Sequence, residues 1–236
     1  MHSTGLMVAL LTAKTVGVPP TQAVELLQVL GAILLLTTFA AVAARLLPQA
    51  IHVYALQSLI LALIAVVIGY FTGSTDLYLV AVLTVLVKCI AIAWILRNAT
   101  RRLHLQREVR PYLNIPASLL ICIFLTVLAF FVSPAVVAPG TFLNEPPLAI
   151  SIAMVLIGLF LLSSRRQAIM QVIGLLTIEN GLFSGAIAIA YGMPLIVEFG
   201  ILFDILIAVM VMSLLVTRIQ RELITADTAD LRRLRG

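Results

Sequence analysis

Long apolar runs separated by short polar segments dominate the chain. A helix that crosses a lipid bilayer needs about 20 mostly apolar residues, and seven stretches meet that requirement. They are residues 24–44, 51–71, 76–97, 115–137, 147–163, 168–191 and 194–217. None of them alternates with the period of two residues that a membrane β-strand shows. The pattern therefore predicts an all-α fold, a polytopic membrane helix bundle with seven transmembrane helices.

The composition supports the same conclusion. Apolar residues make up 62% of the 236 positions and charged residues 11%, and the mean hydropathy is +1.18. A soluble protein of this size could not bury so much apolar surface, because a large share of any globule stays in contact with water. A soluble enzyme, a nucleic-acid-binding module and a disordered regulator are therefore excluded.

The arginines indicate how the chain is oriented. They follow the first, third, fifth and seventh spans, at 45, 97–110, 165–166 and 218–235. With seven spans these positions all fall on one side of the membrane. Because basic residues accumulate in cytoplasmic loops, we expect a cytoplasmic C-terminus and an N-terminus outside. The net charge of +5 is then a consequence of topology and does not indicate a nucleic-acid partner.

The loop 98–114 is the best candidate boundary inside the chain. It would separate an N-terminal three-helix membrane segment, residues 1–110, from a C-terminal four-helix segment, residues 111–236, which ends in a short cytoplasmic tail. Both segments are expected to pack in one bundle.

Four charged residues lie inside the predicted spans and away from their ends: Lys88, Glu179, Glu198 and Asp204. At 1.5 Å per helical residue, Lys88 lies roughly 14 Å and Glu179 roughly 18 Å from the inner face, and Asp204 roughly 15 Å from the outer face. The hydrocarbon core is about 30 Å thick, so these three residues share a level near its middle. Glu198 is shallower, roughly 6 Å from the outer face.

Two carboxylates and one amine at one depth suggest a relay that passes protons sideways through the membrane. Burial and ion pairing shift the titration of such groups in opposite senses, which allows proton exchange near neutral pH. A static buried ion pair that fixes helix register is the alternative, and Glu198 could simply reach water at the headgroups. His52, near the cytoplasmic mouth of the second span, is a candidate entry point.

Other polar and small residues near these charges have weaker signals. Asn180, Gln57 and Thr84 could carry water between sites or form ordinary hydrogen bonds between helices. The glycines at 174, 181 and 185 form one stripe on the sixth span. They favour close packing of a neighbouring helix, with a local distortion of the helix around Glu179 as the alternative.

The sixth span also carries a family resemblance. A basic pair, Arg165-Arg166, precedes the run LLTIENG at 175–181, and Asp204 stands fourteen residues before Arg218. This arrangement resembles the last two helices of the K-type subunit of respiratory complex I. The chain as a whole, including the run EFGILFD at 198–204, resembles component E of hydrogenase-4 and related membrane-bound hydrogenases.

The resemblance implies a non-catalytic membrane subunit of a complex-I-like oxidoreductase, in a bacterial or archaeal cell membrane. Its partners would be an H-type membrane subunit, antiporter-like membrane subunits and lipid. Glu179 and Asp204 would match the family's two carboxylates on a lateral proton or sodium path. Cofactors are expected in partner subunits, as Ni–Fe and iron–sulfur centres, and none in this chain.

Two other functions remain open at the level of sequence. The chain could be a component of a cation/proton antiporter or a stand-alone secondary transporter, although it shows no inverted repeat. It could also be a structural anchor whose buried charges only fix the packing of helices.

Overall fold

The computed structural model describes residues 21–73, 75–102, 113–136 and 145–189, and within these ranges the chain is helical with no β-strand. The helices are α2 (Thr21–Ala43), α3 (Leu47–Thr72), α4 (Thr75–Thr84), the π-helix η1 (Val85–Ile92), α5 (Ala93–Arg102), α6 (Ile115–Val136), α7 (Glu145–Ser164) and α8 (Ala168–Ile189).

Six of the seven predicted spans correspond to described helices that are long and apolar enough to cross a membrane. The third span is made of α4, η1 and α5 in succession, from Thr75 to Thr100. Pro146 and Pro147 lie in the first turn of α7, where a missing amide hydrogen costs nothing. The predicted seventh span, 194–217, lies outside the described residues.

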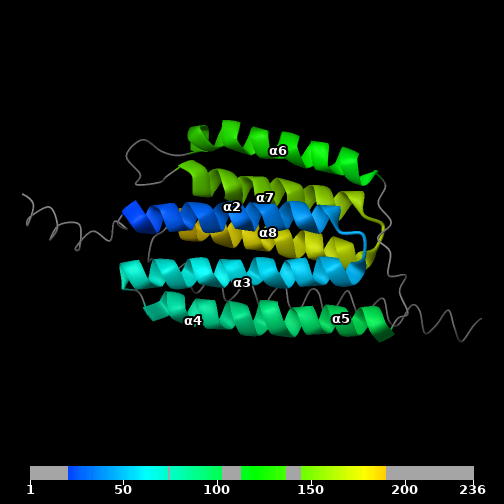
Figure 1. Ribbon diagram of the computed structural model, residues 1–236, viewed down its shortest axis with the longest axis horizontal. Helices are drawn as coiled ribbons and strands as arrows, with labels where there is room; N and C mark the ends of the chain where they lie inside the picture. Colours follow the sequence, from blue (N-terminus) through cyan, green and yellow to red (C-terminus); the bar gives the residue numbers. More distant parts are fainter. Residues whose placement is uncertain (1–20, 74, 103–112, 137–144, 190–236) are drawn as a thin grey trace, which may run out of the picture.

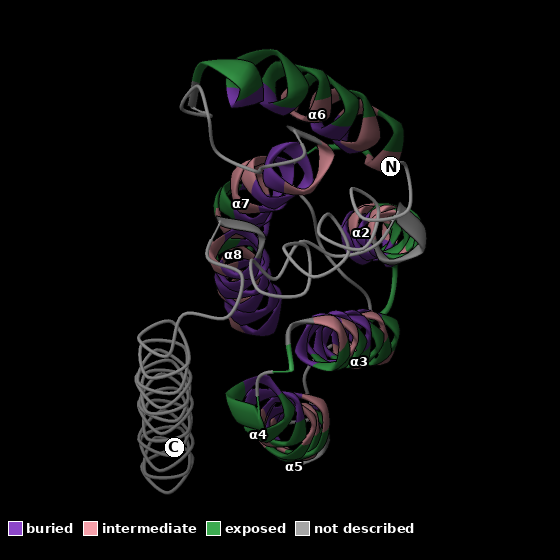
Figure 2. Cartoon of the chain, turned by 90° about the vertical axis from the view of Figure 1, so that its left-hand side faces the viewer, coloured by how far each residue is buried: buried purple, intermediate pink, exposed green. Residues whose placement is uncertain are grey.

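Four helices form the centre of the bundle (Figures 1 and 2). α2 contacts α3 and α7, and α8 contacts α3 and α7. The flanks are α6, which lies against α7, and the α4–η1–α5 span, which lies against α3. Of the six spans α8 is the most buried and α6 the least. Helices from both proposed segments, 1–110 and 111–236, thus pack on one another, while the boundary itself stays a prediction.

Glycines bring α7 and α8 into close contact. A Cβ atom at Gly174 would lie 2.7 Å from the backbone nitrogen of Leu162, and one at Gly158 would lie 2.9 Å from the carbonyl oxygen of Gly174. Small residues let two backbones approach in this way within a membrane. This supports the close-packing interpretation of the glycine stripe. α8 is an unbroken α-helix, so a distortion around Glu179 is wrong for this helix.

Arg165 joins the end of α2 to the turn between α7 and α8. Its side chain is 1% exposed, and its Nη2 donates a hydrogen bond of 2.5 Å to the carbonyl of Val42 in the last turn of α2. A cation at this end of a helix interacts favourably with the helix dipole. Burial lowers the pKa of Arg165, an effect that nearby Cys122 opposes, but arginine stays protonated in proteins. The residue is therefore a buried helix cap, although the sequence alone marked it as a loop arginine.

The close packing of α7 on α8 leads to a prediction about the stability of the protein. Gly174→Ala should lower the free energy of unfolding by about 2 kcal/mol, because the new methyl group meets backbone atoms that cannot move aside. The measurement is unfolding of the purified protein in mixed detergent micelles. Ser163→Ala, an exposed position on α7, is the control and should change stability by less than about 0.5 kcal/mol. Equal stability of the two variants would contradict the predicted approach.

Candidate functional site

A level of buried polar side chains divides the apolar core of the bundle into two parts. One apolar cluster lies on the side of the bundle that holds the C-terminal end of α2, and it includes Tyr54, Ile92 and Leu176. The other, toward the opposite end, includes Leu34, Ile60 and Phe183. The buried polar residues between them are Thr37, Thr38, Gln57, Ser58, Thr84, Lys88, Thr177, Glu179 and Asn180. They come from α2, α3, the third span and α8.

Lys88 and Glu179 form an ion pair in this level. The Nζ atom of Lys88 lies 2.9 Å from Oε1 of Glu179, and the side chains are 1% and 3% exposed. The sequence predicted a similar depth for the two residues on different helices, and in the structure their side chains are in contact. Removing two charges from water costs several kcal/mol per ion, and only close geometry with further hydrogen bonds offsets this cost.

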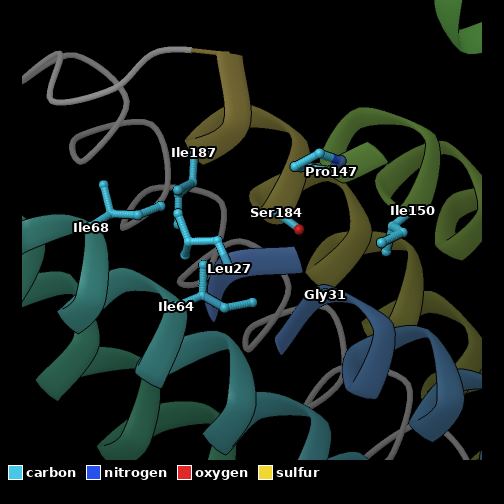
Figure 3. A pocket seen from close by; sticks show the side chains of 8 residues that line it. All are labelled: Leu27, Gly31, Ile64, Ile68, Pro147, Ile150, Ser184 and Ile187. Atoms are coloured by element: carbon cyan, nitrogen blue, oxygen red, sulfur yellow. The ribbon is translucent and has the colours of Figure 1, made fainter. Parts of the chain in front are cut away.

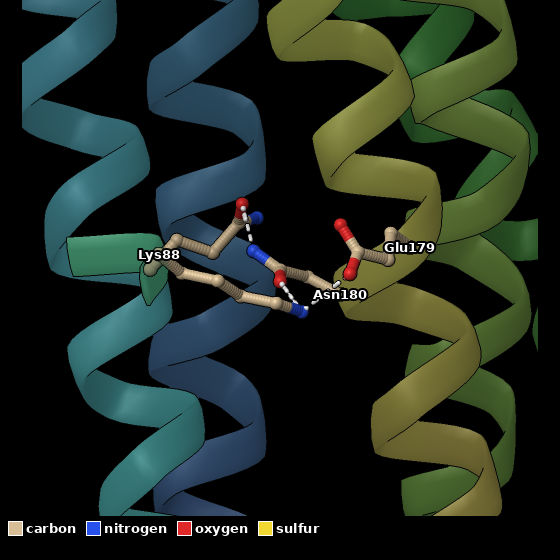
Figure 4. Close-up of polar contacts among 4 residues, drawn as sticks. Lys88, Glu179 and Asn180 are labelled. Carbon is tan, nitrogen blue, oxygen red and sulfur yellow. Dashed lines mark hydrogen bonds and ion pairs between the residues drawn. The ribbon is translucent and has the colours of Figure 1, made fainter. Parts of the chain in front are cut away.

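Further polar contacts extend the pair across the bundle (Figure 4). Lys88 Nζ donates to Oδ1 of Asn180 at 3.1 Å, and Asn180 Nδ2 donates to Oε1 of Gln57 at 3.2 Å. Nε2 of Gln57 then donates to the hydroxyl of Thr38 at 2.8 Å, and that hydroxyl donates to the carbonyl of Leu34 at 3.1 Å. A continuous hydrogen-bonded chain thus runs from η1 through α8 and α3 to α2.

The backbone around Lys88 is a π-helix over eight residues, Val85–Ile92. Such segments are rare and are frequent at functional sites. The sequence offered a reason for a helix distortion only near the glycines of α8, and it did not predict the π-helix at Val85–Ile92. The segment VLVKCIAI contains neither glycine nor proline, so its residues give no sign of an irregular helix.

The other predicted site residues do not join this cluster in the described structure. His52 is exposed on α3, and it takes no part in the ion pair or the hydrogen bonds described for this cluster. Glu198 and Asp204 lie outside the described residues, so their place in the path stays a prediction. Thr38, which ends the hydrogen-bonded chain, was missed because a single threonine in an apolar helix resembles many others.

A small cavity lies between the central helices of the bundle (Figure 3). Its volume is about 30 Å³, and its walls come from α2, α3, α7 and α8. The lining residues are Leu27, Gly31, Ile64, Ile68, Pro147, Ile150, Ser184 and Ile187. The volume exceeds what one water molecule needs, but an ordered water also needs two to four polar partners. Ser184 supplies the one side-chain hydroxyl of this lining, so we expect no ordered water there.

No group of three His, Cys, Asp or Glu side chains within the described ranges could hold a metal ion. The described chemistry of the site is that of a buried carboxylate, an ammonium group, two amides and hydroxyls. Such groups can exchange or hold a proton, or coordinate a small cation through oxygen atoms.

The helices and the buried polar level define a multi-pass membrane protein. Comparison with known proteins identifies its family. The profile of NADH-ubiquinone/plastoquinone oxidoreductase chain 4L matches residues 146–236. The uncharacterised protein Rv0085 of Mycobacterium tuberculosis is 35% identical over 188 residues, which are 78% of this chain and 84% of that protein.

Hydrogenase-4 component E of Escherichia coli K12 is 29% identical over 209 residues, which are 88% of this chain and 96% of that protein. The protein of the same name from Shigella flexneri matches equally well. No solved structure matches. The chain belongs to the same family as Rv0085 and is similar to hydrogenase-4 component E over most of its length, and its C-terminal part has the likeness to the K-type subunit that the sequence indicated.

The ion pair makes a second stability prediction. Lys88→Met should destabilise the protein by about 3 kcal/mol, because the variant leaves the Glu179 carboxylate buried without its ammonium partner. Adding Glu179→Gln to Lys88→Met should recover part of this loss, since the double variant carries no buried charge at either position. Detergent unfolding of the single and double variants provides the measurement, and strictly additive losses would contradict a coupled pair.

Proposed function

We propose that this protein is a non-catalytic integral membrane subunit of a complex-I-like membrane-bound hydrogenase or related respiratory complex. In this proposal Glu179 belongs to a lateral path for protons, or for sodium ions, through the membrane arm. The observation that carries the proposal is the Lys88–Glu179 ion pair, at 2.9 Å and almost completely buried. Ionisable groups kept inside a membrane bundle are characteristic of ion pathways.

The position of the pair supports a role in conduction more than one in anchoring. Glu179 comes from the segment that matches the chain 4L family, whereas Lys88 lies outside that segment. The Lys88 ammonium stabilises the Glu179 carboxylate, and a proton that arrives at the carboxylate neutralises it while Lys88 keeps its own charge. Glu179 can therefore alternate between two states without a large movement of the helices.

The proposal includes the complete topology. Seven spans, with the N-terminus outside and the C-terminus in the cytoplasm, would place every arginine on the cytoplasmic side. The C-terminal ends of α2, α5 and α7 lie on one side of the bundle (Figure 1), which agrees with this arrangement for the described helices. Asp204, on the seventh span, would be the next carboxylate of the path, and Glu198 and His52 would lie nearer the two membrane faces.

The proposed partners are inferred from the similarity to hydrogenase-4 component E and to the chain 4L family. An H-type membrane subunit and antiporter-like subunits would flank this protein in a bacterial or archaeal cell membrane, in contact with lipid. Electron transfer would take place in peripheral partner subunits with Ni–Fe and iron–sulfur centres. This chain would contribute side chains to ion movement and no bound cofactor.

The functional test is proton movement coupled to electron transfer, measured in membrane vesicles that contain the whole complex. Glu179→Gln should reduce this movement to near background, because an amide cannot take up and release the proton, while the complex still assembles. Glu25→Gln, at an exposed position of α2, is the matched control and should behave as the parent protein. Normal coupling in a protein that carries both Glu179→Gln and Asp204→Asn would refute the proposed path.

A second measurement separates a subunit from a stand-alone transporter. The purified chain, reconstituted alone in liposomes, should carry out no cation/proton exchange, because the path would be completed by neighbouring subunits. Purification from native membranes should instead yield a large complex with metal clusters. Exchange by the chain alone, abolished by Glu179→Gln, would favour the transporter function.

A further inference from the structure

Within the described helices, three side chains of α8 contact the ammonium group of Lys88. Glu179 Oε1 lies at 2.9 Å and Asn180 Oδ1 at 3.1 Å, and the centroid of the Phe183 ring lies 5.4 Å from Nζ. An ammonium carries three N–H donors and no acceptor. One partner is charged, one is a neutral oxygen, and one is the face of an aromatic ring, which attracts cations. Two of the three contacts are therefore independent of the charge on Glu179.

The hydrogen-bonded chain behind Asn180 can run in one direction only. At one end the ammonium of Lys88 can only donate, so Asn180 must turn its carbonyl oxygen toward it. At the other end the Thr38 hydroxyl donates to the carbonyl of Leu34, which also accepts from the Thr37 hydroxyl at 2.6 Å, and it accepts from Gln57. A reversed chain would place two donors face to face at Lys88. The Lys88 end therefore requires this orientation of the two amides, and the contacts at Thr38 agree with it.

This orientation has an electrostatic consequence. The amide groups of Asn180 and Gln57 both direct their oxygen atoms toward the Lys88 side of the chain. Their dipoles therefore add, and hydrogen bonds in such a chain polarise and strengthen one another at low dielectric. The chain partly compensates the ammonium charge through a contact that does not involve Glu179.

We propose that Thr38, Gln57 and Asn180 are positioning residues that hold the Lys88 ammonium beside Glu179 whether Glu179 is charged or neutral. This positioning role contributes to ion movement only under the proposed function, because a proton path needs the Lys88 ammonium to stay in place after Glu179 has taken up a proton. Neutral carboxamides have no free site that releases a proton readily, so the chain holds the lysine and does not conduct. Protons would then reach and leave Glu179 from another side.

The proposal can be tested by NMR of the Lys88 side chain, because the chain contains few lysines. Lys14 and Lys88 are its two lysines, so Lys14→Arg leaves a single lysine signal. The full chain, labelled with ¹⁵N at the lysine side chain and ¹³C at asparagine Cγ, is placed in lipid vesicles for solid-state NMR. The dipolar coupling between Lys88 Nζ and Asn180 Cγ then reports directly whether the ammonium is held.

We expect this coupling to persist in Glu179→Gln, because the chain and the ring still hold the ammonium. When Thr38→Val, which has nearly the same shape and lacks the hydroxyl, is added to Glu179→Gln, Gln57 loses its anchor while the ion pair is absent, and most of the coupling should be lost. In the same Glu179→Gln background Thr38→Ser should keep the coupling, and Gln57→Leu should reproduce the loss. Circular dichroism and gel filtration check that each variant is folded.

Two results would overturn the inference. One is an unchanged coupling when Thr38→Val and Gln57→Leu are each added to Glu179→Gln, and the other is loss of coupling in Glu179→Gln by itself. The NMR measurement involves no ion movement, so it can fail while the proposed function holds. Conversely, normal proton movement in a complex that carries Glu179→Gln would refute the proposed function, and it would not change the NMR result for Lys88.

Discussion

The central constraint on this protein is the burial of an ammonium and a carboxylate inside a bundle whose surroundings are hydrocarbon. Lys88 and Glu179 are 1% and 3% exposed, and each is stabilised by the other and by neighbouring polar groups. The contacts that do this come from α2, α3, η1 and α8. The requirement to satisfy one pair of charges thus fixes the relative positions of helices that are far apart in sequence.

The rest of the fold holds this arrangement in place. Apolar clusters lie on both sides of the polar level. Gly158 and Gly174 allow α7 to approach the backbone of α8, so α8 is fixed on the side away from Lys88. Arg165 attaches the end of α2 to the α7–α8 turn, which fixes the helix that supplies Thr38. Few of these elements have room to move independently, as expected for close-packed interiors.

The buried site is shared between two parts of the chain with different relationships to known proteins. The chain 4L family accounts for residues 146–236 and therefore for Glu179 and Asn180. Lys88, Gln57 and Thr38 come from helices that precede this segment. The earlier helices thus do more than anchor the C-terminal part in the membrane, because they supply the counter-charge and the hydrogen bonds that a carboxylate buried in α8 requires.

The sequence by itself determined the class of fold, six of the spans that the structure describes, the family, and the shared depth of Lys88 and Glu179. It could do so because bilayer thickness, helix rise and the cost of buried charge are general constraints that act on each helix separately. Only the tertiary structure decided which helix faces meet. Contact between side chains depends on the rotation of each helix about its axis, and hydropathy does not define that rotation in helices that are apolar all round. For this reason the role of Thr38, the burial of Arg165 and the π-helix around Lys88 emerged only when the helices were packed together.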